Sequence, residues 1–503
     1  MCYRSKKVEV NIKMIHEVRP CLYEIPIGFI PNMKVPGYFI GTPEMAQYAI
    51  QELTDWLPKQ STGIPSILQI ANVSTLNSIT TASLGMPDMH SGYGFSIGGV
   101  AAFNLDDPNA IILPGGIGYD INCGIRCIVT NLTVEEVQPV KHKLIAALYK
   151  NIPVGIAGKR KNFVTKDDII EICNKGAAWA IERGYGEIDD LKYCEEGGCV
   201  DFADAKCVSD RCIERGLDQV GTVGSGNHFV EIQSVDQIFN QKAAAAMGIR
   251  QNQVCIMIHT GSRGLGYQIA SDWMLVCEKD CKDPNLPDKQ LSYIKYDSPT
   301  GRRYMKCMGA AINFAFCNRQ IITHFVRVAF NEVFKDKNNQ LQLKLLYDVA
   351  HNIAKVEKHL VNGIEMNLLV HRKGATRAFG PGSKDIPEKY RSFGQPVIVG
   401  GSMGTASYIL IGTQGAEKTT FGSTCHGAGR VMSRSKGKRD INAKKVVAEL
   451  ASKGIELVTA SKDTILEEAP ETYKDIEQVV NACKTVNISQ KVVRLVPLGV
   501  IKG

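Results

Sequence analysis

The sequence predicts an α+β fold, a single large domain in which helices surround mixed β-sheets and functional residues lie on loops at strand ends. Three observations favour this class. Apolar, strand-like runs are scattered over all 503 residues, and helical patterns fall between them without regular alternation. The hydrophobic content of 44% and the charged content of 22% suit a globular protein with a large core. The irregular alternation disfavours a doubly wound sheet or a barrel.

Several apolar runs rich in β-branched residues predict strands, at 110–116, 124–132, 343–350, 366–371 and 396–401. Two apolar runs lead directly into histidines: VCIMI precedes His259, and LLYDVA precedes His351. A rigid sheet presents functional side chains at its rim in this way, on the loops that follow its strands.

Three segments have the pattern of helices. Residues 42–57 begin at a threonine cap with a glutamate nearby. Residues 165–184 begin at another threonine and end at Gly184, which predicts one helix closed by a glycine. Residues 306–334 are apolar nearly all round, which predicts a buried central helix or a bent pair.

The N-terminal sequence MCYRSKKVEVNIK lacks the apolar core of a signal peptide, and no run approaches the roughly 20 apolar residues of a membrane span. We therefore expect no membrane partner and a reducing compartment, in which the 16 cysteines stay free or bind metal. Cysteines 194, 199, 207 and 212 are close enough to imitate a zinc site. Their spacing does not match a paired CxxC pattern, so core thiols are the favoured interpretation.

The formal net charge of +8 permits an anionic partner without demonstrating one. Basic residues cluster at 158–161, 302–303, 371–377 and 430–439. Such clusters are more often solvated faces than nucleic-acid patches, but the last two lie close in sequence to the candidate functional residues.

Six side chains with metal-binding or nucleophilic chemistry sit in glycine-rich turns: Asp120, Cys123, His228, His259, His351 and His426. Asp, Cys and His are metal ligands, and glycines let backbone N–H groups approach a phosphate closely. The residues alone thus indicate a metal-dependent enzyme acting on a nucleotide or phosphate ester. Because these residues run from 120 to 426, we expect residues 1–503 to fold as one unit, with 1–20 as an N-terminal extension.

Each of these residues also has a structural interpretation when taken alone. Cys123 could be a core thiol, and an isolated histidine more often forms a structural hydrogen bond. Their shared context favours ligation. One Asp, one Cys and three His can hold two ions with a shared thiolate, which suits phosphoryl transfer. The ligand types admit zinc as well as manganese.

His426 is followed by Gly427, Gly429 and Arg430, which suit a phosphate better than a metal. It could attack phosphorus as a nucleophile or serve as a further metal ligand. The loop from Gly400 to Ser407 offers backbone donors and hydroxyls for a nucleotide. His90 and Asp88 could belong to the same site. His371 could help Arg372, Lys373 and Arg377 hold a polyanion. The chain has neither a GxxxxGK[ST] phosphate loop nor a KxDG lysine motif.

Nine motifs in the same order resemble the RtcB family of RNA ligases: PDMHSGYGFSIG, PGGIGYDINCGIR, GSGNHFVEI, HTGSRGLG, AHNIAKVE, HRKGATRAFGPG, GSMGTASY, TCHGAGR and LGVIKG. The resemblance implies an enzyme that joins RNA 2′,3′-cyclic phosphate or 3′-phosphate ends to 5′-hydroxyl ends, with GTP and two Mn²⁺ ions. It further implies RNA substrates such as tRNA exon halves, a tRNA-ligase complex with a DEAD-box helicase and archease, and a location in cytoplasm and nucleus.

The resemblance also implies roles for individual residues. Asp120, Cys123 and His228 would bind one manganese, and Cys123, His259 and His351 the second. His426 would take GMP from GTP. The resemblance implies that the guanylate is held by Asn227, His228, Phe229, Val230, Glu231, His351, Asn352, Gly400, Gly401, Ser402, Met403, Ser407, His426, Gly427, Ala428, Gly429, Tyr473 and Lys502. The C-terminus, which carries Lys502, is then expected to fold back into the site.

Two other function classes remain as alternatives. A metal-dependent cyclic phosphoesterase would use the same Asp, Cys and His ligands without guanylylation. A non-catalytic scaffold of an RNA complex would need only the basic surface and would tolerate loss of Cys123.

Overall fold

The computed structural model describes residues 8–61, 63–337 and 340–503. The first seven residues of the expected N-terminal extension lie outside this description. The helices are α1 (Pro43–Trp56), α2 (Ser66–Val73), α3 (Val134–Val137), α4 (Lys141–Asn151), α5 (Lys166–Lys175), α6 (Ala177–Glu182), α7 (Ile188–Lys192), α8 (Asp210–Gly216), α9 (Gln241–Met247), α10 (Arg263–Asp280), α11 (Pro299–Val333), α12 (Gln414–Thr420), α13 (Arg434–Asp440), α14 (Ala443–Ser452), α15 (Lys462–Glu467) and α16 (Ile476–Thr485).

The strands are β1 (His16–Arg19), β2 (Leu22–Ile25), β3 (Gly37–Ile40), β4 (Ile79–His90), β5 (Ile97–Asn104), β6 (Ile111–Ile112), β7 (Gly124–Thr133), β8 (Phe229–Ile238), β9 (Gln253–Thr260), β10 (Ile294–Lys295), β11 (Leu343–Ala350), β12 (Asn352–Val361), β13 (Ile364–Lys373), β14 (Ala375–Arg377), β15 (Pro396–Val399), β16 (Ser407–Gly412), β17 (Ser423–Cys425), β18 (Glu456–Thr459) and β19 (Ser489–Lys502).

Two large sheets form the framework. One sheet has seven strands in the order β1-β2-β3-β4-β5-β13-β12, with β3 and β4 parallel. The other has eight strands: β11-β7-β9-β8-β19-β16-β15 are antiparallel neighbours, and β18 runs parallel to β19. Two short pairs, β6–β10 and β14–β17, complete the arrangement. The predicted α+β fold with mixed sheets is confirmed.

One residue that the sequence singled out links a strand of one large sheet directly to a strand of the other. Strand β11 of the eight-stranded sheet ends at Ala350, and β12 of the seven-stranded sheet begins at Asn352. His351 lies between them, and its backbone carbonyl accepts a hydrogen bond from the N–H of Ala375 at the start of β14. The junction therefore brings loops from both sheets to one place.

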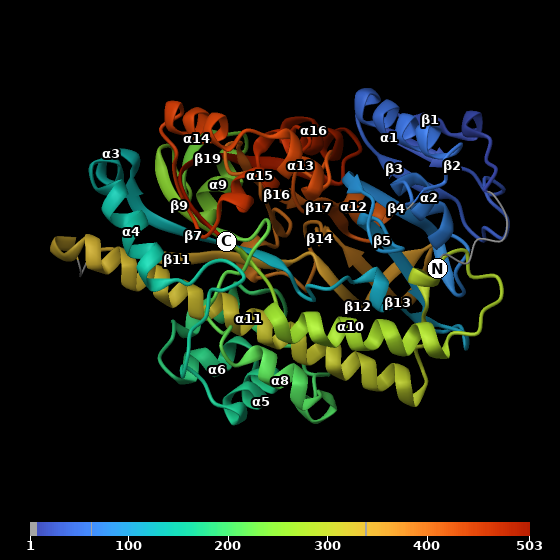
Figure 1. The fold of residues 1–503 in the computed structure, drawn as a ribbon, viewed down its shortest axis with the longest axis horizontal. Helices are drawn as coiled ribbons and strands as arrows, with labels where there is room; N and C mark the ends of the chain where they lie inside the picture. The colour runs from blue at the N-terminus through green and yellow to red at the C-terminus, as the bar shows by residue number, and fades with distance from the viewer. Residues whose placement is uncertain (1–7, 62, 338–339) are drawn as a thin grey trace.

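The predicted central helix is α11, a continuous helix of 35 residues that Ser298 caps through a hydrogen bond to the Gly301 N–H. In Figure 1, α10 and α11 run side by side along one side of the sheets, and α5, α6 and α8 lie beyond them. Residues buried on nearly every side of α11 explain the all-round apolar pattern, since the helix packs between the sheets and this outer layer.

Two sequence predictions about elements are corrected by the structure. The helix expected over 165–184 is two helices, α5 and α6, because Gly176 has a φ of +59° and a side chain there would meet the carbonyl oxygen of Gly198. The strand expected over 110–116 is reduced to Ile111–Ile112, since Pro114–Gly116 form a 3₁₀ turn. The helix predicted over 42–57 is confirmed as α1, with Thr42 as its cap.

In the part of the chain that the structure describes, no helix combines the length and apolar character needed to cross a membrane. All fifteen described cysteines are free thiols.

Candidate metal and nucleotide site

The register of four neighbouring strands places the predicted metal ligands at one edge of the eight-stranded sheet. Gly124, the first residue of β7, pairs with Ala350 of β11 on one side and Thr260 of β9 on the other. Cys123, His351 and His259 are the chain neighbours of these three residues, so the ligands converge without any long loop. On the next strand, Phe229 pairs with His259, which brings His228 to the same edge.

The side chains form a continuous series of short contacts. His228 Nε2 lies 3.0 Å from Asp120 Oδ2 and 3.2 Å from Cys123 Sγ. Cys123 Sγ lies 3.4 Å from His259 Nε2, which in turn lies 3.3 Å from His351 Nε2. All five residues predicted from the sequence as metal ligands are therefore gathered in one cluster, in which Asp120 and His228 are half-buried and the other three are buried.

The donor chemistry of this cluster fits a cation. His228 Nδ1 lies 3.1 Å from the Val223 carbonyl oxygen, to which it donates, and its Nε2 faces a carboxylate and a sulfur. Burial lowers the pKa values of His259 and His351 well below the usual range, which keeps both imidazoles neutral. Lone pairs that face one another at these distances repel unless a proton or a metal ion lies between them. Among the described residues, the one group of three close metal donors is Cys123, His228 and His259.

The buried polar residues of α11 hold the loops that carry the ligands. The Arg319 guanidinium donates to the backbone carbonyls of Asn122 and Thr260 and to the carboxylate of Asp348. Asn318 donates to the Thr222 carbonyl on the loop that leads to His228. These residues are fully buried. The central helix therefore fixes the turn before β7, the end of β9 and β11 relative to one another.

His426 lies at the opposite end of the cluster from Asp120. Its ring contacts that of His351, with 4.7 Å between centroids, and its Nδ1 lies 2.6 Å from Oδ2 of Asp88. The same carboxylate oxygen accepts the backbone N–H groups of His426 and Gly427. Asp88 thus fixes the imidazole from the Nδ1 side and leaves Nε2 for chemistry. The sequence suggested Asp88 only as a possible member of the site, through its place in the PDMH motif.

The C-terminal strand brings Lys502 to the site, as expected. Strand β19 pairs with β8, and Lys502 lies opposite Phe229. Its Nζ donates to Asn227 Oδ1 at 2.8 Å and lies 5.1 Å from the Phe229 ring centre. Burial lowers the pKa of Lys502 to about 8.

Glu231 of β8 has a buried carboxyl group of which only one oxygen forms a hydrogen bond among the described residues. Its Oε2 accepts a hydrogen bond from Gln233, but Oε1 has no hydrogen-bond partner among the described residues. Burial raises the pKa of this carboxyl to about 8. A buried carboxyl oxygen of this kind fits a hydrogen-bond donor of a bound ligand.

The loop from Gly400 to Ser407 is buried and lies behind the turn after His426. Gly400 forms a backbone bridge with Gly427, and the Ser407 hydroxyl accepts from the Gly401 N–H and from Gln233. Asn352 donates to the Asp120 carbonyl and accepts from the Gly374 N–H. Five more residues belong to the nucleotide contacts that the family resemblance implies. They are Ser402 and Met403 in the buried loop, Val230 in β8, and Ala428 and Gly429 in the turn after His426.

A cleft of about 1040 Å³ opens over the cluster, lined by Asp120, Cys123, His228, His259, His351, His426 and Tyr473 among others. Tyr473 hydrogen-bonds the buried carboxylate of Glu468, which also pairs with Arg430 and Arg434. Glu468 is a site residue that sequence reasoning missed, since no motif surrounds it. Arg430 and Arg434 line the cleft, and guanidinium N–H groups are suited to phosphates.

The polyanion site suggested around His371 is wrong for three of its four residues. His371 Nε2 accepts the Leu113 N–H inside the core, and burial lowers its pKa to about 3. Arg372 pairs with Glu357, and Arg377 with Glu195 and Glu196. Only Lys373 of this group lines the cleft, and its Nζ donates to three backbone carbonyls.

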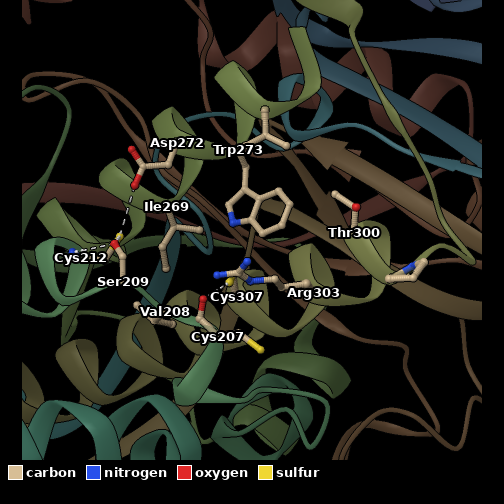
Figure 2. A pocket seen from close by; sticks show the side chains of 12 residues that line it. Cys207, Val208, Ser209, Cys212, Ile269, Asp272, Trp273, Thr300, Arg303 and Cys307 are labelled. Carbon is tan, nitrogen blue, oxygen red and sulfur yellow. Dashed lines mark hydrogen bonds between the residues drawn. The ribbon is translucent and has the colours of Figure 1, made fainter. Parts of the chain in front are cut away.

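The cysteines between 194 and 212 do not gather into a set of zinc ligands. The Cys194 thiol accepts from Arg126 in the core, and Cys199 lies near the Asn174 carbonyl. Cys207 and Cys212 line a separate cavity of about 440 Å³ between α8, α10 and α11, together with Cys307 (Figure 2). There Cys212 contacts Ser209 and Asp272, and Cys307 donates to the Cys207 carbonyl.

Comparison with known proteins agrees with this geometry. The family model described as tRNA-splicing ligase RtcB matches residues 69–503. The chain belongs to the RtcB family. It is also similar to a protein named tRNA-splicing ligase RtcB from the archaeon Methanococcus maripaludis strain S2, with 47% identity over 483 residues that cover 96% of this chain and 98% of that one. All residues of the candidate RtcB site, from Asp88 to Lys502, lie within the matched range.

Proposed function

We propose that this RtcB-family protein joins RNA ends in tRNA splicing, by linking a 2′,3′-cyclic phosphate or 3′-phosphate end to a 5′-hydroxyl end at the expense of GTP. The observation that carries the proposal is the placement of His426. A histidine held by a buried carboxylate lies at the end of a Cys/His cluster with metal-donor geometry, beside a positive cleft. Family membership supports the reaction class.

Asp120, Cys123 and His228 would hold one metal ion, and Cys123, His259 and His351 the second, with the thiolate shared. Mn²⁺ is the ion that the family resemblance implies. When bound, such ions neutralise phosphate charge and stabilise the attacking and leaving oxygens of a displacement.

His426 is the proposed nucleophile. Its Nε2 attacks the α-phosphorus of GTP, an N–P bond forms, the bond to the β-phosphate oxygen breaks and pyrophosphate leaves. Asp88 stabilises the positive imidazole that results, in the way a buried carboxylate serves a catalytic histidine elsewhere. Arg430 and Arg434 lie in the cleft beside the departing charge.

The 3′-phosphate of the RNA then attacks the phosphorus on His426, which restores the neutral imidazole and leaves an RNA-3′-pp-5′-G end. A cyclic end must first be opened by water, with cleavage of the P–O2′ bond. The 5′-hydroxyl of the second RNA attacks the activated phosphate, a 3′,5′-phosphodiester forms and GMP leaves. Activation is needed because a phosphate monoester dianion is a poor electrophile.

The guanine base is proposed to lie against Glu231 and Lys502. The unpartnered Oε1 of Glu231 would accept from guanine N–H groups, and the Lys502 ammonium would donate to the guanine oxygen. An adenine edge presents the opposite pattern, so this pair would select GTP over ATP.

A ligation assay distinguishes this function from the alternative, a metal-dependent cyclic phosphoesterase. RNA with a 2′,3′-cyclic phosphate is mixed with RNA bearing a 5′-hydroxyl, Mn²⁺ and either GTP or no nucleotide. We expect a joined product only when GTP is present. Conversion of the cyclic end to a 3′-phosphate in both mixtures, without any joined product, would contradict the proposal and favour the phosphoesterase.

The partners and location are proposed from the family resemblance alone: a complex with a DEAD-box helicase, activation by archease, and a place in cytoplasm and nucleus. Affinity purification of the tagged full-length protein, with fluorescence imaging of the same cells, tests both. Recovery of the protein without a helicase would contradict the first proposal. Restriction to another compartment would contradict the second.

A further inference from the structure

The cleft extends past the metal cluster to three tyrosines, Tyr93, Tyr119 and Tyr267, which we name the aromatic surface. Tyr119 immediately precedes Asp120 in the chain. Tyr267 lies on α10 shortly after Ser262, whose backbone N–H donates to Asp120 Oδ1 at 3.0 Å. The aromatic surface is thus attached to the Asp120 end of the cluster, whereas His426 lies at the other end.

The three rings of the aromatic surface pack against one another. Tyr119 and Tyr267 are stacked, with ring centres 5.0 Å apart and an angle of 22° between their planes. Tyr93 meets Tyr119 edge-on at 5.9 Å, and its hydroxyl donates to Glu278. The Arg215 guanidinium lies 5.4 Å from the centre of the Tyr267 ring.

This arrangement leaves apolar surface exposed inside a cleft that also carries charged side chains. Tyr267 is 47% exposed, and Ile156, which lines the same cleft, is 81% exposed. Exposed rings beside an arginine are the chemistry with which proteins stack unpaired nucleic-acid bases, because every base has a π-face and guanidinium groups stack on it too. Single-stranded ends are also the part of an RNA whose bases are accessible.

We propose that the aromatic surface, with Arg215, binds unpaired bases next to the RNA end held at the metal cluster. This inference rests on the proposed ligase function and deepens it. The guanylate occupies the His426 and Glu231 side, and the RNA bases occupy the Asp120 side. The aromatic surface binds a base whatever its identity, since stacking is tolerant of sequence.

The test measures binding of short fluorescent single-stranded RNA to Tyr267 variants. Tyr267→Ala is expected to weaken binding about 5- to 150-fold, the range for loss of one stacked base. Tyr267→Phe keeps the ring and should stay within about twofold of the parent protein. Tyr267→Leu keeps apolar bulk without a π-face and should behave like the alanine variant. Tyr149→Ala on α4, where the ring is 42% exposed away from the cleft, is the matched control.

A second arm asks which RNA end is bound. In one set of assays the RNA with the 3′-phosphate lacks the base next to that end. In another set the RNA with the 5′-hydroxyl lacks the base next to its end. The KM for ligation is measured for each modified RNA. We expect the abasic residue to raise the KM of the parent protein at one of the two ends. In Tyr267→Ala, the abasic residue at that end should raise the KM little, because the stacking contact is already lost.

Two results would overturn the inference: equal binding by the Ala, Leu and parent proteins, or abasic effects that persist unchanged in Tyr267→Ala. Guanylylation of His426 by GTP needs no RNA, and we expect it to remain in the Tyr267 variants. If the parent protein ligates and these binding predictions fail, the aromatic surface alone is wrong. If the parent protein neither guanylylates nor ligates, the proposed function is wrong.

Discussion

At the scale of single residues, the site is defined by close contacts between polar side chains, several of which are buried. Cys123 lies between two histidines at 3.2 and 3.4 Å, and burial raises the pKa of its thiol well above the usual range in the absence of a metal. A bound cation reverses this balance, because a coordinated thiol is deprotonated. Cys123 is thus expected to be a protonated thiol without a metal ion and a shared thiolate with one.

Replacement of Cys123 tests the shared thiolate. Cys123→Ala is expected to lower metal affinity by more than the roughly 10- to 100-fold seen when an outer partner of a metal ligand is removed. Guanylylation should be lost with it. Metal content and adduct formation are measured together, and Cys127→Ala, another buried cysteine on β7, is the control. Undiminished guanylylation in Cys123→Ala would contradict the assignment.

Glu231 predicts a pH dependence of stability. Its pKa of about 8 in the folded protein lies above the ordinary value of 4.5, so folding favours the protonated form. Wild-type stability is therefore reduced as pH rises from 4.5 to about 8. Glu231→Gln removes this ionisable group. Between pH 4.5 and about 8, its free energy of unfolding should therefore rise relative to that of wild type by about 1.4 kcal/mol per pH unit, and the difference should stay constant above this window.

Denaturant unfolding at several pH values measures this difference. The exposed Glu365→Gln is the control and should follow wild type. Parallel stability curves for Glu231→Gln and wild type would contradict the account, because they would show that the Glu231 carboxyl does not change its protonation between the folded and unfolded states in this window.

At the scale of elements, α11 packs in the core and also holds the loops of the site through hydrogen bonds from its buried polar side chains. The sequence predicted its burial but not its polar function, because an apolar pattern does not reveal which loops Arg319 and Asn318 contact. The gathering of the predicted ligands at one edge could be expected from the sequence, since glycine-rich turns at the ends of strands carry their own signal. The contact of Asp88 with His426, the place of Glu468 and the break at Gly176 could not, because each depends on contacts between segments far apart in the chain.

Arg319→Met tests this role of α11. The change leaves the buried Asp348 with one arginine fewer and the Asn122 and Thr260 carbonyls without their donor. We expect a loss of about 3–5 kcal/mol in the free energy of unfolding, typical of a broken buried ion pair, and weaker metal binding. Arg302→Met, an exposed residue of the same helix, should change stability by less than about 0.5 kcal/mol. Equal effects of the two variants would contradict this role.

At the scale of the whole molecule, the site is assembled from segments between Asp88 and Lys502. His351 joins the two large sheets, and the last strand, β19, lies inside one of them. The expectation that the chain folds as one unit therefore has a thermodynamic consequence. Whatever binds at the cluster should stabilise every part of the protein together.

Thermal unfolding with and without Mn²⁺ measures this coupling. We expect a single transition that far-UV circular dichroism and tryptophan fluorescence report at the same temperature. Saturation at about 100 times the dissociation constant should stabilise the fold by about 2.7 kcal/mol and move both signals equally. Cys123→Ala should lose the shift. Two separate transitions, of which only one responds to Mn²⁺, would contradict folding as one unit.

The central claim is that His426 carries GMP, and intact-protein mass spectrometry after incubation with GTP and Mn²⁺ tests it most directly. Wild type and His142→Ala, which alters an exposed histidine on α4, should each gain the mass of one guanylyl group. His426→Ala should gain none. An adduct that persists in His426→Ala, or the absence of any adduct on a wild-type protein that ligates RNA, would contradict the account.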